Sequence, residues 1–334
     1  MSDLWKSCLN CDAASGQPSE LAKRVLAEVG YLVDKQGKNI ETLLSRCDAY
    51  DQLHPDETVR HFVRKAKQTI LTECSDFLSD GSEDQLAAHS KFLHRMSRRR
   101  ARDSRLKLFT TNYDLCFEAA AAQQASVPIT GFSFTEPRYF DPRFFDYDIV
   151  RRSAVESEIG TPVEGVFHLY KLHGSVNWNR TEAGYIEMAA DPPPDTAVLI
   201  YPADGKYQQS YVQPHLELMS RYLAALREPN TCVVVVGFGF NDSHLSEPIL
   251  SAIGANPHLR LIVVDWRARE KTTGEGDDSN DEWRVLKALV RDGYDVWLVN
   301  ATFSQFARVI PDLRALSAGE RLRRSIRDVA RGGE

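Results

Sequence analysis

Three short motifs place polar side chains and glycines directly after apolar runs. They are TTNYD at residues 110–114, KLHGS at residues 171–175 and GFGFND at residues 237–242. Amides, hydroxyls and carboxylates can hydrogen-bond a sugar or a phosphate, and a histidine can act as a general base near neutral pH. In an open parallel sheet, ligands bind at the carboxyl ends of the strands. The three motifs are therefore the first candidates for a binding or catalytic site.

Each candidate residue also has a structural interpretation. Thr111, Asn112 and Asp114 could bind a ligand, or they could cap the helix that the sequence predicts over residues 115–122. His173, with Gly174 behind it, could be an exposed general base, or a histidine that only shapes a turn. Both interpretations stay open at this point.

The third motif ends an apolar strand and precedes a helix-like segment. Gly237 and Gly239 would let the backbone approach a ligand closely, and Asp242 could cap the helix or bind a hydroxyl.

Asp265 lies 26 residues after Gly239, near the usual spacing for an acid that holds ribose hydroxyls, although an ordinary loop aspartate fits equally well. Trp178 could line a pocket or pack in the core, and Tyr201, Pro202 and Lys206 are weaker candidates.

Short apolar runs alternate with helical patterns from residue 105 onward. This alternation predicts an α/β fold with a mostly parallel sheet and right-handed crossovers. The run TCVVVVG is apolar enough for a strand that is covered on both faces. The predicted strands are 106–109, 167–172, 198–201, 232–236, 261–264 and 296–299, and the clearest helices between them are 215–226 and 283–291.

The remaining segments differ in character. Residues 19–100 show helical periodicity and predict a helical lobe, which ends in the basic run 95–102. That run could be a solvated face or a surface for nucleic acid or an acidic partner. Residues 132–165 read as an irregular insert near a site, residues 271–281 as a surface loop, and the segment from residue 303 as a charged helical tail.

Composition excludes several classes of protein. The length of 334 residues suggests about two domains. The 41 Lys and Arg residues and 47 Asp and Glu residues give a net charge of −6, which argues against a protein that coats nucleic acid through its overall charge. No apolar run is long enough to span a membrane, and no secretory signal is evident, so we expect a cytoplasmic protein. The six cysteines read as free, mostly buried thiols. Cys8 and Cys11 form a lone CxxC without a second pair, so we expect no metal site.

The order of the motifs resembles the sirtuin-like fold. More specifically, it resembles the bacterial antiviral NAD-hydrolysing branch, and within it the subunit that works with a HerA-type hexameric ATPase. DLWK at residues 3–6 and the IYP and lysine of residues 200–206 extend the likeness over nearly the whole chain. The resemblance implies a Rossmann-like, mostly parallel sheet with an inserted helical lobe. The expected parts are a lobe at 1–104, a sirtuin-like domain at 105–302 with the insert 132–165, and a helical tail at 303–334.

The resemblance also implies roles for single residues. Asn112 matches the asparagine that holds the nicotinamide ribose and positions the attacking water, and His173 matches the histidine that activates a ribose hydroxyl or water. The other positions implied to bind NAD are Thr111 and Asp114 near the nicotinamide ribose, Gly174 and Ser175 beside the histidine, and Gly237, Gly239 and Asp242 near the adenosine half.

The implied function is an NAD+ glycohydrolase that forms ADP-ribose and nicotinamide in antiviral defence by NAD depletion. NAD would be the substrate, no metal would be required, and the implied partners are further copies of the chain and a HerA-like ATPase, with nucleic acid bound only through that complex. The chain lacks the two CxxC pairs that hold zinc in deacetylase sirtuins, which disfavours deacetylation.

A second departure concerns the glycine loop of the family. The GAG-x-S loop is absent from residues 1–20, so we expect the first strand and this loop to lie upstream of Met1 or to have degenerated. The alternative function is therefore an impaired module that binds NAD or ADP-ribose, or a scaffold for the ATPase. A nucleic-acid-processing factor, suggested by residues 95–102, is a third possibility.

Overall fold

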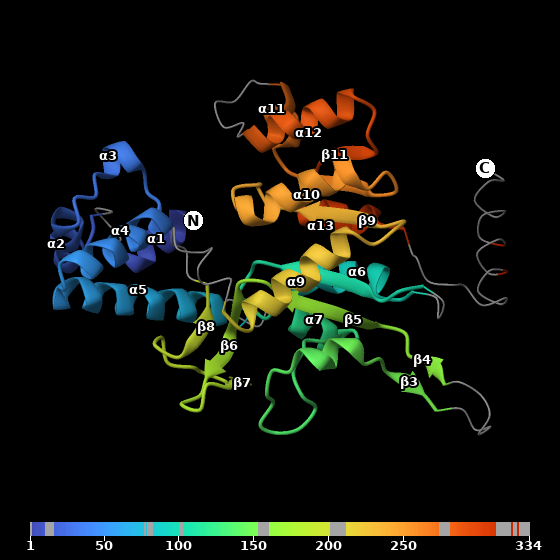
Figure 1. Cartoon of the computed structure of the whole chain (residues 1–334), viewed down its shortest axis with the longest axis horizontal. Coiled ribbons are helices and arrows are strands. Elements are labelled where there is room, and N and C mark those ends of the chain that lie inside the picture. The colour runs from blue at the N-terminus through green and yellow to red at the C-terminus, as the bar shows by residue number, and fades with distance from the viewer. Residues whose placement is uncertain are drawn as a thin grey trace.

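The computed structural model describes residues 2–10, 17–76, 78, 83–99, 103–152, 160–200, 212–273, 281–311, 322 and 326. These residues form a helical lobe beside a mixed α/β body (Figure 1). The body confirms the α/β class and the parallel strand pairing expected from the sequence. Within the described residues, no helix is long and apolar enough to cross a membrane.

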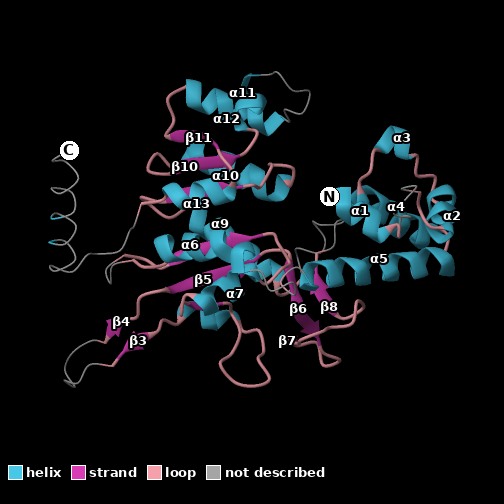
Figure 2. Cartoon of the chain, turned by 180° about the vertical axis from the view of Figure 1, so that it is seen from behind, coloured by secondary structure: helices cyan, strands magenta, loops and turns pink. Residues whose placement is uncertain are grey.

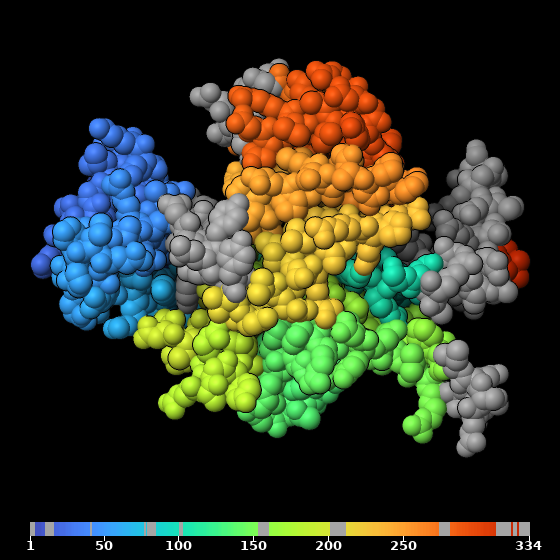
Figure 3. All heavy atoms as spheres, viewed as in Figure 1, coloured from blue at the N-terminus to red at the C-terminus, as the bar shows by residue number. Residues whose placement is uncertain are grey.

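Helices build the lobe, and the longest of them is amphipathic. In α5, apolar residues recur at helical spacing, so Val59, Phe62, Ala66 and Ile70 are all buried. The lobe has its own core, which also takes in Val176 and so touches the body. It stands out at one end of the molecule in Figure 3. The helices are α1 (Ser2–Cys8), α2 (Glu20–Glu28), α3 (Val33–Gln36), α4 (Ile40–Leu53) and α5 (Glu57–Asp76).

The body contains two separate parallel sheets of three strands. One has the order β1-β5-β2, and the other has the order β11-β10-β9. Each strand that the sequence predicts in these sheets appears within about a residue of its expected bounds, whereas the short strand at residues 127–129 was not predicted. The strands are β1 (Leu106–Thr110), β2 (Val127–Ile129), β5 (Val166–Lys171), β9 (Cys232–Val236), β10 (Arg260–Asp265) and β11 (Val296–Asn300).

Strands β1 and β9 each pair with one neighbour, so each has an unpaired edge in the described part of the chain. The valines of β9 are therefore half-buried rather than covered on both faces, which corrects the expectation from TCVVVVG. Helix α9 (His215–Leu226) runs across the region between the two sheets in Figure 1 and contributes Leu218, Tyr222 and Leu226 to a core that both sheets share. Packing by this helix, not a continuous ladder, links the two sheets.

Further helices complete the layers. Helix α6 was grouped with the lobe on sequence, but its Phe92 and Leu93 pack with β1, β5, α7 and α13. Figure 2 shows the body from behind, with α6 and α13 lying beside the strands. The elements are η1 (Glu83–Leu86), α6 (Ala87–Met96), α7 (Cys116–Gln123), α10 (Ser243–Ala255), α11 (Ala268–Thr273), α12 (Asp281–Arg291) and α13 (Phe303–Val309).

The body also contains antiparallel strands. β6 (Gly174–Arg180) leaves the KLHGS turn and pairs with β7 (Ile186–Met188) and β8 (Ala197–Leu199). The strand predicted over 198–201 overlaps β8, whereas β6 and β7 were not predicted. The insert 132–165 is less irregular than expected, since it holds η2 (Pro142–Asp146), β3 (Val150–Arg151) and β4 (Thr161–Pro162). Trp178 lies in the core against Phe132, with ring centroids 5.3 Å apart, so its packing interpretation is confirmed.

Two other expectations are partly answered. In the basic run, Arg99 donates to the carbonyls of Met96 and Ser104, and Arg98 pairs with Glu164 at 3.7 Å, so both serve the chain's own structure. Arg95 lies in the last turn of α6, and residues 100–102 of the run lie outside the described residues. Among the cysteines, Cys8, Cys47 and Cys116 are buried free thiols as expected, whereas Cys232 is exposed, which corrects the interpretation there.

A buried histidine fixes the start of α9 to the KLHGS turn. His215 is 5 % exposed, and its Nδ1 lies 3.0 Å from the carbonyl oxygen of Leu172. Because a carbonyl only accepts, Nδ1 must carry the proton. Burial lowers the pKa of His215 from 6.5 to about 4, so the imidazole is neutral at physiological pH.

We expect acid to destabilise the protein through this histidine. Between pH 6.5 and about 4 the unfolded chain binds a proton that the folded His215 does not, so the contribution is complete above pH 6.5 and is lost as the pH falls. The gap corresponds to about 3 kcal/mol. His215→Asn keeps an N–H donor but does not titrate, so its free energy of unfolding, measured by denaturant titration, should fall less steeply over this range. His61→Asn, at an exposed position, is the control. Equal slopes for the wild type and His215→Asn would contradict the assignment.

Candidate functional site

A buried lysine joins the first two motifs. Lys171 ends β5, is 2 % exposed, and its ammonium donates to the carbonyl oxygens of Tyr113 (3.1 Å) and Asp114. It also donates to Ser175 Oγ at 2.8 Å and lies 3.2 Å from a carboxylate oxygen of Glu118 on α7. A buried ammonium is costly unless its protons are satisfied, and here four oxygens satisfy it. The TTNYD loop and the KLHGS turn are thus fixed to one charged atom.

The TTNYD loop presents Asn112 to solvent. Thr110 and Tyr113, on either side of it, accept backbone hydrogen bonds from Leu172 and Val176 at 2.8 and 3.1 Å. The backbone N–H of Asn112 itself donates to Thr110 Oγ1 at 3.1 Å. Asn112 is exposed and Thr111 is half-buried, so both can reach a ligand.

Asp114 has a structural task in the same loop. Its carboxylate accepts from the backbone N–H of Cys116 at 2.9 Å, in the first turn of α7. The N-cap residue is Leu115, which has no side-chain cap bond, so Asp114 supports the start of α7 from one position earlier, at the helix end where negative charge is favourable. It remains half-buried, so the ligand role that the resemblance implies stays a prediction.

His173 is buried, with only 4 % of its surface exposed, so the exposure that went with the general-base interpretation is not found. Its carbonyl accepts from Ile200 at 2.8 Å, and Leu172 before it is held by His215 at 3.0 Å. The backbone on both sides of the imidazole is therefore fixed. His173 Nε2 lies 3.4 Å from Nε2 of His244, in the first turn of α10, with ring planes inclined by 24°.

Gly174 and Ser175 are explained by packing. A Cβ on Gly174, at φ +88°, would lie 2.0 Å from the carbonyl oxygen of Val198, so β6 could not pair with β8 there. Ser175 is fully buried and its hydroxyl donates to Asn177 Oδ1 at 2.7 Å while it accepts from Lys171. These contacts shape the turn from inside, and they account for both residues without a bound ligand.

The GFGFND turn brings the third motif to the second. Gly237 and Gly239 have φ of +63° and +74°, which favour glycine, and a Cβ on Gly237 would meet no described atom within 4 Å. The open space beside Gly237 fits a backbone that approaches a ligand. Asp242 is the N-cap residue of α10, two positions before His244, so the turn delivers both to the same end of the helix.

Asp265 does not join this group. Its carboxylate accepts from Lys271 Nζ at 2.9 Å and from the backbone N–H of Arg267 at 2.7 Å, so it organises the turn between β10 and α11. This contact set favours the loop interpretation. Tyr201, Pro202 and Lys206 lie outside the described residues. Among the residues that the structure does describe, no three His, Cys, Asp or Glu side chains are grouped to hold a metal ion.

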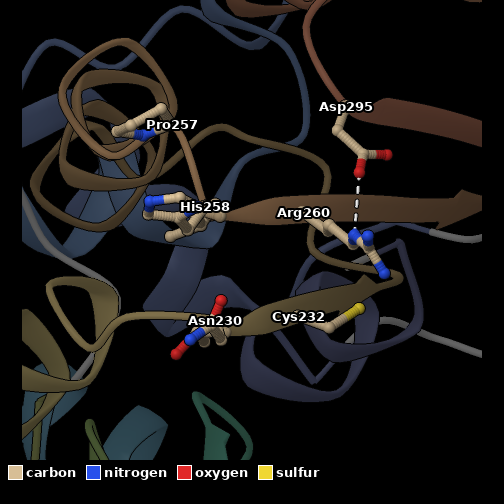
Figure 4. A pocket seen from close by; sticks show the side chains of 8 residues that line it. Asn230, Cys232, Pro257, His258, Arg260 and Asp295 are labelled. Atoms are coloured by element: carbon tan, nitrogen blue, oxygen red, sulfur yellow. Dashed lines mark ion pairs between the residues drawn. The ribbon is translucent and has the colours of Figure 1, made fainter.

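A separate hollow of about 260 Å³ lies at the amino ends of the strands of the β11-β10-β9 sheet, away from the GFGFND turn (Figure 4). Cys232 and Arg260 are there at the amino ends of β9 and β10, and Arg260 pairs with Asp295 at 2.8 Å. None of the described candidate residues lines this hollow.

The sequence missed two residues of the site. Lys171 is part of the KLHGS motif, but a lysine is normally solvated, so the sequence alone indicated no structural role for it. Its four oxygen partners in the fold show that role. His244 follows GFGFND by two positions and gives no signal on its own, since its partner lies 71 residues away along the chain. The arrangement offers an exposed amide at Asn112, a buried pair of imidazoles and an open glycine turn.

We expect Lys171→Met to destabilise the protein strongly, since it leaves two carbonyls, a hydroxyl and Glu118 without their shared donor. Breaking such a buried pair lowers the free energy of unfolding by about 3–5 kcal/mol. Lys107, on β1, pairs with Glu228 and is partly exposed, so Lys107→Met should lower the free energy of unfolding by less than about 1 kcal/mol. Denaturant titration measures both free energies of unfolding. Similar small losses in the two variants would refute the role given to Lys171.

Comparison with known proteins assigns the family. No curated protein matches the chain. A family model described as a SIR2-like domain matches residues 106–286, which include all three motifs, His244 and both parallel sheets except β11. SIR2-like domains bind NAD. Because the matched segment covers more than half of the sequence, the chain belongs to the SIR2-like domain family.

Proposed function

We propose that the chain is an NAD+ glycohydrolase that converts NAD+ and water to ADP-ribose and nicotinamide. The observation that carries the proposal is the joining of the Asn112 loop and the His173 turn through Lys171, in a chain whose family is SIR2-like. Hydrolysis needs few protein groups, because nicotinamide leaves readily from the ribose. A site for it needs an orienting polar group, a base and a positioned water.

In this reaction the bond between ribose C1′ and the pyridinium nitrogen breaks, and its electron pair leaves with nicotinamide. A water oxygen forms the new bond to C1′. Asn112, exposed at the carboxyl end of β1, orients the ribose and the water. His173 takes a proton from the water or from a ribose hydroxyl as positive charge develops on the sugar.

The adenosine half is assigned to the GFGFND turn. Gly237 has the open flank that close approach requires, and Asp242 lies at the start of α10. Thr111 is half-buried next to Asn112 and is assigned to the nicotinamide ribose. Protein deacetylation is disfavoured, because the sequence lacks the two CxxC pairs that hold zinc in deacetylase sirtuins.

The cellular role that we propose is defence against phage by depletion of NAD+. It rests on the ordered motifs that resemble defence subunits, and it includes assembly with further copies and with a HerA-like hexameric ATPase. Nucleic acid would then act on the complex and not on the isolated chain, which has a net charge of −6. The compartment proposed for this role is the cytoplasm.

The enzymatic proposal predicts that purified protein consumes NAD+ and that Asn112→Ala and His173→Ala each reduce turnover by at least about a hundredfold. His258→Ala, at an exposed position in the far hollow, should retain wild-type turnover. Nicotinamide release measured by chromatography is the readout, with unfolding midpoints to show that each variant is folded. NAD+ binding without turnover would favour the alternative of a binding or scaffold module.

The cellular proposal predicts a fall in NAD+ when bacteria that carry the chain and a HerA-like ATPase are infected by phage. The His173→Ala chain with the same ATPase should leave NAD+ and phage yield as in bacteria without the system. Mass photometry of the two purified proteins together should show a particle larger than either. If NAD+ stays constant during infection while the purified enzyme is active, the defence role is wrong.

A further inference from the structure

Two histidines from different motifs face each other in the site. His173 follows β5, and His244 lies in the first turn of α10, yet their Nε2 atoms are 3.4 Å apart and their ring centroids 5.6 Å apart. The same nitrogen of each ring therefore points into the same small region. One oxygen atom beside them can contact both nitrogens at once.

The turn that delivers His244 is strained and firmly supported. Phe240 has φ +63°, a conformation that costs a non-glycine residue about 1 kcal/mol. It is 1 % exposed and packs edge-on against Trp283, with centroids 6.0 Å apart. Behind the turn, Tyr222 of α9 donates to the carbonyl of Leu245 at 2.7 Å. Such support holds an unfavourable backbone and keeps the first turn of α10 in place.

Chemistry restricts the proton positions in this pair. Two Nε2–H groups would repel each other at this distance, and so would two Nε2 lone pairs. The contact is a hydrogen bond between neutral rings when one ring carries its proton on Nε2 and the other carries it on Nδ1. A general base that acts through Nε2 must be the ring whose Nε2 is unprotonated.

We propose that His244 is a second catalytic histidine, which donates its Nε2–H to the oxygen from which His173 takes a proton. This inference rests on the proposed function, since that oxygen belongs to the water or ribose hydroxyl of NAD+ hydrolysis. In the step, the O–H bond breaks, its proton binds His173 Nε2, and its electron pair stays on the oxygen. The N–H of His244 stabilises the negative charge that develops there, and His244 remains neutral throughout.

The kinetic test compares two replacements of His244. His244→Phe keeps the ring and removes the donor, whereas His244→Gln places an amide N–H near the position of Nε2. We expect His244→Phe to lower kcat for NAD+ by about 10²–10³ with KM nearly unchanged, as for the loss of one donor to a developing oxyanion. His244→Gln should keep kcat within about tenfold of wild type. His258→Phe, the same change at an exposed histidine, should have no effect.

Two kinetic outcomes would overturn the inference while leaving NAD+ hydrolysis intact. One is a His244→Phe protein with wild-type kcat. The other is equal loss in His244→Phe and His244→Gln, because a role in shape alone would not distinguish donor from non-donor. If the wild-type protein does not cleave NAD+, the proposed function fails. The tautomers of His173 and His244 then test the roles given to the two rings separately.

The tautomers are measurable without turnover. In protein with ¹⁵N-labelled histidine at pH 8, above the ordinary histidine pKa of about 6.5, His244 should show the Nε2–H tautomer and His173 the Nδ1–H tautomer. Loss of signals in His173→Phe and His244→Phe assigns the two rings. The reverse pattern, or the same tautomer on both, would overturn the inference.

Discussion

The ammonium group of Lys171 holds the ends of β1, β5 and α7 together. Removing a charge from water costs several kcal/mol, so this lysine is tolerated only because the carbonyls of Tyr113 and Asp114, the Ser175 hydroxyl and Glu118 surround it. Two of these partners are backbone atoms directly after Asn112. The path of the Asn112 loop and the start of the His173 turn therefore cannot shift independently, and their relative position is a property of the folded core.

A second joint crosses from one parallel sheet to the other. Because β1 and β9 do not pair with each other in the described chain, no ladder sets the distance between the sheets. Side-chain contacts do this instead, through α9 and α10. His215 on α9 holds Leu172, Tyr222 on the same helix holds Leu245, and His173 meets His244. The contact between the two histidines thus lies where α10, which is held by α9, meets the KLHGS turn.

Local signals predicted every described parallel strand except β2, and they predicted the helices α9 and α12, since apolar runs and helical periodicity report burial directly. The helix expected over 215–226 is α9 to the residue. β6 was missed because its sequence, GSVNWNR, contains the polar residues Ser175, Asn177 and Asn179, and such a sequence is typical of a loop. In the fold, each of these polar side chains makes a side-chain hydrogen bond, so the strand accommodates them. Sequence also proposed Asn112 and His173 as site residues, which stays a prediction, but it did not indicate the residues that hold them in place. In a sequence, a lysine that will be buried cannot be told from an exposed one. His244 is recognised only by its contact with His173, which the tertiary fold brings near.

The contrast between the two central side chains constrains how a ligand must be bound. Asn112 is exposed and His173 is 4 % exposed, so the amide faces solvent while the imidazole is largely closed off. At 3.4 Å, the contact of His173 with His244 is longer than a strong hydrogen bond. Catalytic hydrogen bonds are often long in the free enzyme and tighten with substrate bound. An oxygen that enters between the rings replaces this weak contact with two shorter ones, so the pair loses little when a ligand arrives and gains most as charge develops on that oxygen.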